Sequence, residues 1–181
     1  CWKKERLNWY LNLGIKKENI KLVDLPKEDI AHYSKGTSEI WYRWPFMGFW
    51  ELEGVANRGD YDLTAHSKLS GKELSYFDEE SKKRYTPYVI EPSVGVGRAM
   101  LAFLIDSYSE EKDRVVLRHH PKLSPIKAAV FPLLDNKLPL AKMARAIYDN
   151  LKKSIKDSIA FDERGNIGKR YYSQDEIGTP F

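Results

Sequence analysis

The stretch from Ser38 to Tyr61 constrains the fold most, because it is dense in aromatic and β-branched residues. Residues of these types are enriched in β-strands. Pro45 and Gly48 interrupt the run and favour a bend in the chain. The stretch therefore predicts two antiparallel strands around a turn. Its aromatic cluster, residues 41–50, is expected to belong to the core rather than to a ligand site.

The segments around this stretch predict further short elements. They are a helix from Trp2 to Leu13 ended by Gly14, a strand from Ile20 to Leu25, a helical turn from Pro26 to Tyr33, and strands at Val89–Ile90 and Val115–Arg118. Charged residues dominate from Lys68 to Arg84, so most of that segment is expected to be a solvated loop. The apolar residues between Ala99 and Tyr108 predict a buried helix.

A change of pattern after the stiff connector Pro121–Pro125 predicts a domain boundary, with domains at residues 1–121 and 122–181. The second part is expected to contain two strands and two helices, at Ile126–Leu134, Leu138–Lys153, Ser158–Phe161 and Ile167–Glu176. Met143, Ile147 and Leu151 are expected to face inward from the first of these helices. Strand, helix and strand in succession are typical of a parallel sheet. The predicted fold class is α/β in the wider sense, an antiparallel sheet with helices followed by a smaller parallel or mixed domain.

Charge and composition exclude few classes of function. The formal net charge is +4, from 30 basic and 26 acidic residues, so the basic bias is weak support for an RNA partner. The longest apolar runs are far shorter than the roughly 20 residues of a membrane span, and no signal pattern is present. The single cysteine, Cys1, allows no internal disulfide, which fits a reducing, cytoplasmic location. Because the chain opens with Cys1-Trp2 inside an apparent helix, we expect it to be a fragment.

Three segments contain candidate site residues. The first, Glu91-Pro92-Ser93-Val94-Gly95-Val96-Gly97-Arg98, combines a strand, a glycine turn and a helix start. Its glycines allow a ligand to approach the backbone, and the guanidinium of Arg98 can lie against an aromatic base or a phosphate. Taken alone, the segment is better explained by a structural turn.

The second segment runs from Trp50 to Leu63. Strand alternation places Glu51 and Glu53 on one face and Leu52 and Val55 on the other. Two carboxylates on one face can hold a divalent cation or an ammonium group. The alternative is a solvated acidic strand face.

The third segment, Gly165 to Phe181, interleaves basic and aromatic residues that can contact phosphates and stack on unpaired bases. A solvated helix face with two core tyrosines explains it equally well. His119 and His120 are adjacent and would point to opposite faces of a strand, so a metal site there is not expected.

In this order, ELEGVANRGDYDL at Glu51–Leu63, VIEPSVGVGR at Val89–Arg98 and RYYSQDEIGTPF at Arg170–Phe181 resemble the dimeric, single-chain glycyl-tRNA synthetases. The resemblance covers essentially the whole chain, and the combination of motifs is highly specific. It implies the C-terminal part of a class II antiparallel-sheet catalytic domain, followed by a truncated α/β anticodon-binding domain. It also implies a cytoplasmic glycine–tRNA ligase that activates glycine with ATP and transfers it to the 3′ end of tRNA(Gly).

The resemblance assigns roles to individual residues. Arg98 is the adenine-stacking residue of motif 3, in an ATP site with Glu51, Leu52, Gly95, Val96 and Gly97. Glu51 is the carboxylate expected to face Mg²⁺. The glycine site comprises Glu91, Pro92, Ser93, Val94, Gly95 and Arg58, with Glu91 reading the ammonium group.

The resemblance also implies what the chain lacks. Motif 1, which builds the homodimer interface, and motif 2, which grips the α-phosphate, would lie upstream of Cys1. The chain alone is therefore expected not to adenylate glycine. Trp41 stands where many relatives have an acid, and the spacing of Phe46–Trp50 differs from theirs.

Two other function classes are compatible with parts of the chain. One is a synthetase-like module that binds nucleic acid without catalysis, and the other is an RNA-binding module formed by the second half alone. The joint presence of Glu51, Glu91, Ser93 and Arg98 favours the enzyme, because a pure binding module needs no adenylate pocket.

Overall fold

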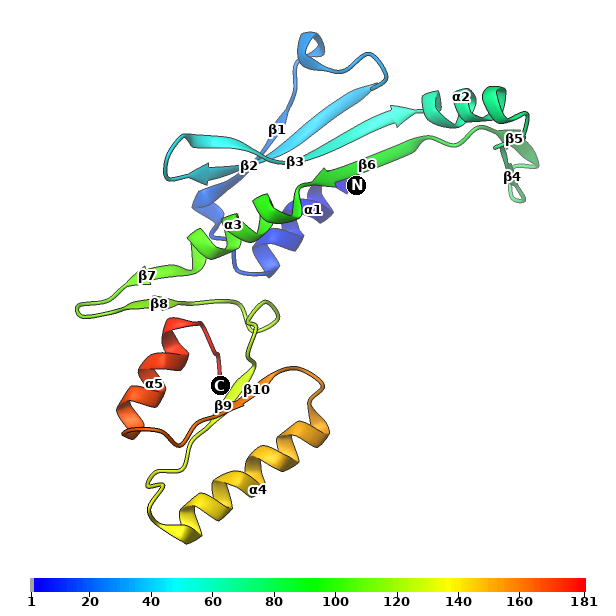
Figure 1. Ribbon diagram of the computed structural model, residues 1–181. Coiled ribbons are helices and arrows are strands. Elements are labelled where there is room, and N and C mark those ends of the chain that lie inside the picture. The colour runs from blue at the N-terminus through cyan, green and yellow to red at the C-terminus, as the bar shows by residue number, and fades with distance from the viewer. Residues whose placement is uncertain (1) are drawn as a thin grey trace. The chain divides into compact units, whose positions relative to one another are not determined.

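The computed structural model describes residues 2–181, so the disulfide expectation for Cys1 lies outside the described residues. The chain divides into two compact units, Cys1–Ala102 and Phe103–Phe181, each drawn in Figure 1. The boundary expected near Pro121 falls inside the second unit, and the assignment of functional domains stays a prediction.

A four-stranded antiparallel sheet forms the centre of the first unit. Its strands are β1 (Ile20–Asp24), β2 (Gly36–Trp44), β3 (Gly48–Gly59) and β6 (Val89–Val94), in the order β1-β2-β3-β6. The two strands predicted around Pro45 and Gly48 are confirmed as β2 and β3. Gly48 has a φ of 75°, which suits a glycine at the tight turn between them.

Helix α1 (Trp2–Asn12) covers one face of this sheet, contacting β1, β2 and β6 (Figure 1). The helix is followed by Gly14 with a φ of 102°, as predicted. Two short 3₁₀ turns, Lys17–Asn19 and Lys27–Asp29, flank β1. The core of the unit lies between α1 and the sheet, where its large buried side chains include Tyr10, Ile40, Tyr42 and Leu52.

A β-bulge in β3 contradicts the prediction that Glu51 and Glu53 share one face of the strand. Ile40 pairs with Glu53 and Trp41 with Glu51, so Leu52 is an extra residue opposite β2. Because of this extra residue, the side chains of Glu51 and Glu53 point to opposite faces of the sheet. Glu53 is completely buried on the α1 side, whereas the Glu51 side chain is 41% exposed.

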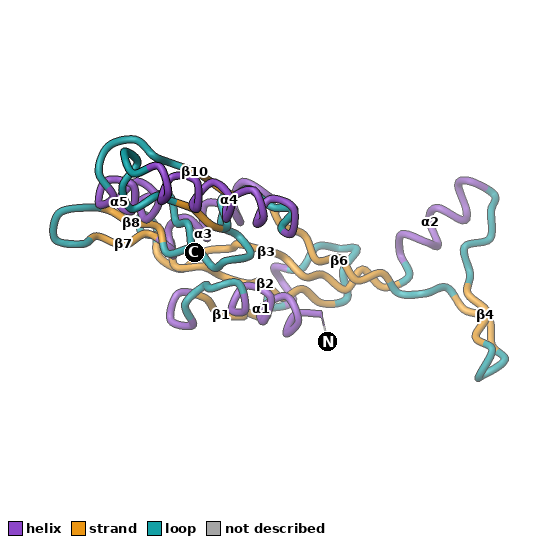
Figure 2. The backbone as a smooth tube through the Cα atoms, turned by 90° about the horizontal axis from the view of Figure 1, so that it is seen from below, coloured by secondary structure: helices purple, strands orange, loops and turns teal. Residues whose placement is uncertain are grey.

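The segment after β3 is more ordered than the predicted loop. It contains helix α2 (Tyr61–Ser70) and a hairpin of β4 (Tyr76–Asp78) with β5 (Lys83–Tyr85). Figure 2 shows both projecting from the end of β3 and β6. None of the residues of α2 is buried, so the helix lacks the apolar stripe that sequence patterns detect.

Helix α3 (Val96–Ser107) follows β6, but the prediction that it is buried is wrong for most of its length. Met100 is 61% exposed, and Leu101 and Leu104 are also exposed. Ala102, Asp106 and Ser107 are its buried residues. Apolar content therefore identified the helix correctly but not its environment.

The second unit contains the predicted βαβ arrangement. Strand β9 (Ala128–Val130) lies parallel to β10 (Ile159–Phe161), and α4 (Leu138–Ser154) connects them. Helix α5 (Ile167–Glu176) has the predicted bounds. An antiparallel pair, β7 (Tyr108–Glu110) with β8 (Val115–Leu117), precedes them. Strand β9 is shorter than the predicted strand and only partly buried.

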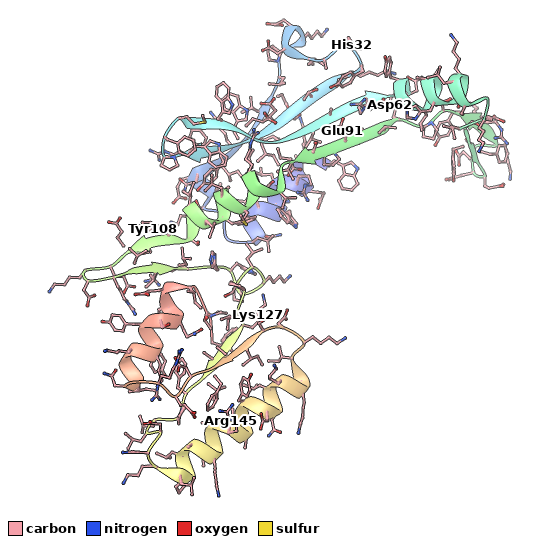
Figure 3. The ribbon with its side chains drawn as sticks, viewed as in Figure 1. His32, Asp62, Glu91, Tyr108, Lys127 and Arg145 are labelled. Carbon is pink, nitrogen blue, oxygen red and sulfur yellow. The ribbon has the colours of Figure 1, made fainter. Side chains whose placement is uncertain are left out.

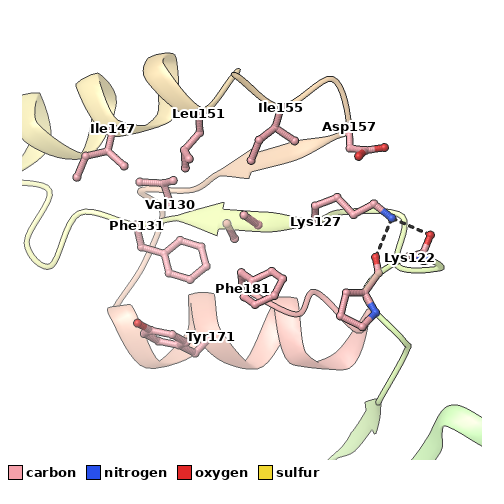
Figure 4. Close-up of a pocket in the computed structure, with 13 residues that line it drawn as sticks. Lys122, Lys127, Val130, Phe131, Ile147, Leu151, Ile155, Asp157, Tyr171 and Phe181 are labelled. Carbon is pink, nitrogen blue, oxygen red and sulfur yellow. Dashed lines mark hydrogen bonds between the residues drawn. The ribbon is translucent and has the colours of Figure 1, made fainter. Parts of the chain in front are cut away.

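The inward face predicted for α4 is only partly correct. Met143 is 62% exposed, which contradicts the prediction for that residue. Ile147 and Leu151 face an open hollow of about 850 Å³, with Phe131, Tyr171 and Phe181 on its other side (Figure 4). Its lining is mainly apolar and brings no pair of carboxylates together, so it is not the candidate catalytic site. Within residues 2–181, no helix has the length and apolar character of a membrane span.

Candidate functional site

Two rows of residues cross β2, β3 and β6 on the face of the sheet opposite α1. Each row has a small residue on the central strand and polar residues on its neighbours. The rows are Glu39, Gly54, Ser93 and Thr37, Ala56, Glu91. A floor of small residues between polar walls leaves room for a small polar ligand.

These six residues line a cavity of about 250 Å³, together with Glu51 and Tyr33. A methyl group built on Gly54 would meet no protein atom within 4 Å, so the space above this glycine is open. Three glutamates, at positions 39, 51 and 91, contribute to the lining. Converging carboxylates favour a cationic group such as an ammonium. We call this space the acidic cavity.

Arg58 fixes the position of Glu91. Its Nη1 donates to Glu91 Oε2 over 2.7 Å, and its Nε and Nη2 donate to both carboxylate oxygens of Asp62 over 2.5 and 2.9 Å. The guanidinium lies over the Tyr33 ring, with its carbon 4.2 Å from the ring centroid. Hydrogen bonds to Asp62 and Glu91 raise the pKa of Arg58, and hydrogen bonding to Arg58 lowers the pKa of Asp62.

Figure 3 shows where Glu91 on β6 and Asp62 at the start of α2 lie. The Glu91 side chain remains 41% exposed despite its ion pair, so it stays accessible to a ligand. Arg58 and Glu91 were predicted to be neighbours, and the structure brings them into contact.

A second cavity, of about 380 Å³, lies at the start of α3. Its lining includes Arg98, Gly97 and Leu101 from α3, and Glu51 borders it as well as the acidic cavity. Arg98 Nη1 lies 3.5 Å from Glu51 Oε2 and 3.4 Å from its carbonyl oxygen. Glu51 therefore connects the two spaces. We call this second space the arginine cavity.

The aromatic cluster at residues 41–50 is divided between core and cavity. Trp44 is buried, as predicted, but Phe46, Met47 and Trp50 are exposed and line the arginine cavity. Trp41 stacks with Trp50 at 6.1 Å between centroids, and its Nε1 donates to Glu39 Oε2 over 2.6 Å. The prediction of a core role is therefore wrong for the exposed members, which instead frame a ligand-sized space.

The structure does not bring all predicted site residues to the two cavities. Glu51, Glu91 and Ser93 line the acidic cavity, and Gly97 and Arg98 line the arginine cavity. The others are absent from both linings, namely Arg58, Leu52, Pro92, Val94, Gly95 and Val96. Arg58 acts through Glu91, and the side chain of Leu52 is buried in the core. The functional roles of all these residues stay predictions.

Sequence reasoning missed Glu39, Thr37, Gly54 and Ala56, because their alignment depends on strand register, which the bulge in β3 changes. As for the Mg²⁺ prediction, no three His, Cys, Asp or Glu side chains between residues 2 and 181 are grouped as a metal site.

The third predicted segment is partly structural. Arg170 is buried, and its guanidinium donates to the carbonyls of Pro132, Glu163 and Gly165 over 2.5 to 2.8 Å. It is therefore unavailable to an RNA phosphate. Tyr171 and Tyr172 are exposed. Gly178 packs against His119, whose pKa is lowered by burial.

No protein-family model matches the chain. It is 50% identical to the glycine–tRNA ligase of Streptomyces coelicolor and 51% identical to that of Thermobifida fusca, each over 99% of the chain and 41% of the relative. The enzyme of the same name from Caldanaerobacter subterraneus is 49% identical over 99% of the chain and 39% of its own length. The chain thus spans about two fifths of the curated relatives it matches.

A solved structure supports the fold. A Giardia lamblia prolyl-tRNA synthetase in complex with prolyl-adenylate matches with a TM-score of 0.67 at 14% identity, over 99% of this chain and 35% of the other. At that identity the match concerns the fold alone. Along nearly all of its length the chain is therefore a homologue of one part of the glycine–tRNA ligases, with the fold of a part of an aminoacyl-tRNA synthetase.

Proposed function

We propose that the chain carries part of the active site of a glycine–tRNA ligase. In that reaction the glycine carboxylate attacks the α-phosphorus of ATP, pyrophosphate leaves, and glycyl-adenylate forms. A ribose hydroxyl at the 3′ end of tRNA(Gly) then attacks the glycyl carbonyl, and AMP leaves. The observation that carries the proposal is the junction of the acidic and arginine cavities at Glu51.

Glycine fits the acidic cavity by charge and by size. Its ammonium group would lie between Glu91 and Glu39, with Ser93 offering a hydroxyl on the β6 side. A hydrogen bond from an ammonium to a carboxylate is worth about 1.5–3 kcal/mol. Gly54 and Ala56 leave space for this small substrate at the floor of the cavity.

Rejection of alanine would need more than attraction. A pocket that merely attracts one substrate distinguishes a single methylene by about 1–3 kcal/mol. The walls formed by Glu91 and Ser93 would therefore discriminate by steric exclusion once glycine is seated.

ATP fits the arginine cavity. The guanidinium of Arg98 would stack on the adenine, which is a favourable geometry for a planar cation and an aromatic base. Glu51, between the two cavities, would face the phosphates through Mg²⁺, which usually combines one or two protein carboxylates with phosphate oxygens. This arrangement would place the glycine carboxylate beside the α-phosphate, so that positioning and charge neutralisation supply the catalysis.

The remaining assignments extend the same proposal. Residues 122–181 would form the start of an anticodon-binding domain that contacts tRNA(Gly), and the enzyme would act as a cytoplasmic homodimer. We assign two further parts of the enzyme to regions outside this chain. They are the segment that binds the α-phosphate and the interface of the homodimer.

Glycine-dependent ATP–pyrophosphate exchange by the full-length protein tests the proposal. We expect exchange with glycine, none with alanine, and a loss of at least about tenfold in Arg98→Ala. Lys4→Ala, an exposed change on α1, serves as the matched control and should exchange normally. A folded full-length protein without glycine-dependent exchange would contradict the proposal and favour a nucleic-acid-binding module without catalysis.

A further inference from the structure

A third cavity in the first unit has a different character. It measures about 430 Å³ and lies between residues 32–35 and the first turns of α2. Three aromatic rings gather at it. His32 lies 5.2 Å from Tyr33 and 6.1 Å from Tyr61 between ring centroids, both edge to face, and Tyr61 is 51% exposed. Figure 3 shows His32 in its loop near the start of α2.

The charged residues of this lining are mostly basic. Lys35, Arg58 and Lys68 contribute to it against the single acid Asp60. Lys35 Nζ donates to Tyr88 over 2.8 Å and to Asp60 over 3.3 Å. Lys68 lies one helical turn beyond Thr64 and Ala65, which share the lining. Aromatic rings beside ammonium groups suit a ligand with a flat base and a phosphate.

This basic aromatic cavity adjoins the acidic cavity. Tyr33 lines both cavities. Arg58 lines the basic aromatic cavity, and its Nη1 donates to Glu91, which lines the acidic cavity. A ligand in the basic aromatic cavity would therefore lie next to the bound amino acid, on the other side of the Arg58–Glu91 ion pair. ATP is already assigned to the arginine cavity, which shares none of these lining residues.

We propose that this cavity binds an unpaired nucleotide near the 3′ end of the RNA substrate, with its base stacked on Tyr61 and its phosphate at Lys68. The inference rests on the proposed function, because the RNA end must approach the activated amino acid. Single-stranded RNA is commonly held by such stacking and by basic side chains. A free nucleotide shares this chemistry but has no need to lie beside the amino acid.

The test uses Tyr61→Ala and Lys68→Ala in the full-length protein. Glycine-dependent ATP–pyrophosphate exchange should stay within about twofold of the unchanged protein, whereas kcat/KM for aminoacylation of tRNA should fall about tenfold for each variant. Tyr61→Phe should restore the rate, because it keeps the stacking ring. The matched controls are Tyr108→Ala, an exposed tyrosine on β7, and Lys4→Ala on α1.

Competition separates the two sources of the ligand. A single-stranded RNA tetranucleotide should inhibit aminoacylation by the unchanged protein and inhibit Tyr61→Ala at least about fivefold less, while AMP should show no such difference. The inference is wrong if both variants aminoacylate normally, or if they lose as much pyrophosphate exchange as aminoacylation. It is also wrong if AMP, and not the tetranucleotide, inhibits the unchanged protein more strongly than it inhibits Tyr61→Ala. Absence of exchange in the unchanged protein would instead contradict the proposed function.

Discussion

Each face of β3 carries a glutamate, and the two glutamates lie in opposite environments. On the α1 face, Glu53 is completely buried and receives hydrogen bonds from Arg6 Nε and Nη2 over 2.6 and 2.9 Å and from Tyr10 over 2.7 Å. On the other face, the Glu51 carboxylate is partly exposed and lies 3.5 Å from Arg98 Nη1. Glu53 is satisfied within the protein, whereas Glu51 keeps capacity for a ligand.

The surroundings of Glu53 show the cost of burying charge. Its hydrogen bond raises the pKa of Arg6, and burial, followed by the hydrogen bond to Glu53, raises the pKa of Tyr10. A buried carboxylate is tolerated when each oxygen has such partners. The difference between the two faces fits a structural role for the carboxylate on the α1 face and the proposed substrate-binding role for those on the cavity face.

The largest expected effect is loss of stability when the α1 face is broken. Glu53→Ala should lower the free energy of unfolding by about 3 kcal/mol, because it leaves Arg6 and Tyr10 without their acceptor. Urea unfolding measures the change. Glu39→Ala, on the cavity face, is the matched control and should cost less than about 1 kcal/mol. Equal losses from the two variants would remove the distinction between the faces.

The next effect concerns activity on the cavity face. Glu91→Gln should reduce kcat/KM for glycine in the exchange assay by about 100-fold, since a hydrogen bond to a charged group is worth up to about 3 kcal/mol. Its urea unfolding midpoint should remain near that of the unchanged protein. A variant with normal exchange would exclude Glu91 from ammonium binding.

A smaller and more selective effect is expected at the cavity floor. Gly54→Ala puts a methyl group into the open space, so we expect the KM for glycine to rise about tenfold. Stability should be unchanged or higher by up to about 1 kcal/mol, because alanine restricts the unfolded chain more than glycine does. Gly36→Ala on β2, where a methyl group also meets nothing within 4 Å, is the control for KM. A normal KM in Gly54→Ala would place the substrate elsewhere.

The smallest effect is a pH dependence of the stability contributed by the Arg58–Asp62 ion pair. The folded pKa of Asp62 is lowered, so its stabilising contribution is complete above its unfolded pKa of about 3.9 and is lost as the pH falls through the folded value. The difference in unfolding free energy between the unchanged protein and Asp62→Asn should therefore shrink below about pH 4. Urea unfolding at pH 3, 5 and 7 measures it. A difference that does not vary with pH would show that the ion pair does not contribute.

Local patterns predicted much of the fold. The aromatic and β-branched stretch identified β2 and β3, helical spacing of apolar residues identified α1 and α4, and α5 has the predicted bounds. The segment from Glu91 to Arg98 does contain a strand that leads into a helix. These features depend on neighbours in sequence, which is why the sequence reveals them.

The composition of the acidic cavity was only half predictable. Glu91, Ser93 and Glu51 belong to recognisable motifs, whereas Glu39 and Gly54 enter the site only through cross-strand register. Register depends on long-range pairing and here on a bulge, which leaves no local signal. Helix α2 was missed for another reason: it packs too little apolar surface to show a periodic pattern.

The bulge at Leu52 also bears on which length changes this region can accept. An insertion or deletion in the turn at residues 45–47 changes only the loop between two strands. Inserting one residue into β2 between Ile40 and Trp41 would give Leu52 a partner and restore strict alternation in β3, so that either Glu51 would turn toward α1 or Glu53 would turn away from Arg6. Length variation among related chains should therefore accumulate in this turn and be rare between Ile40 and Trp41.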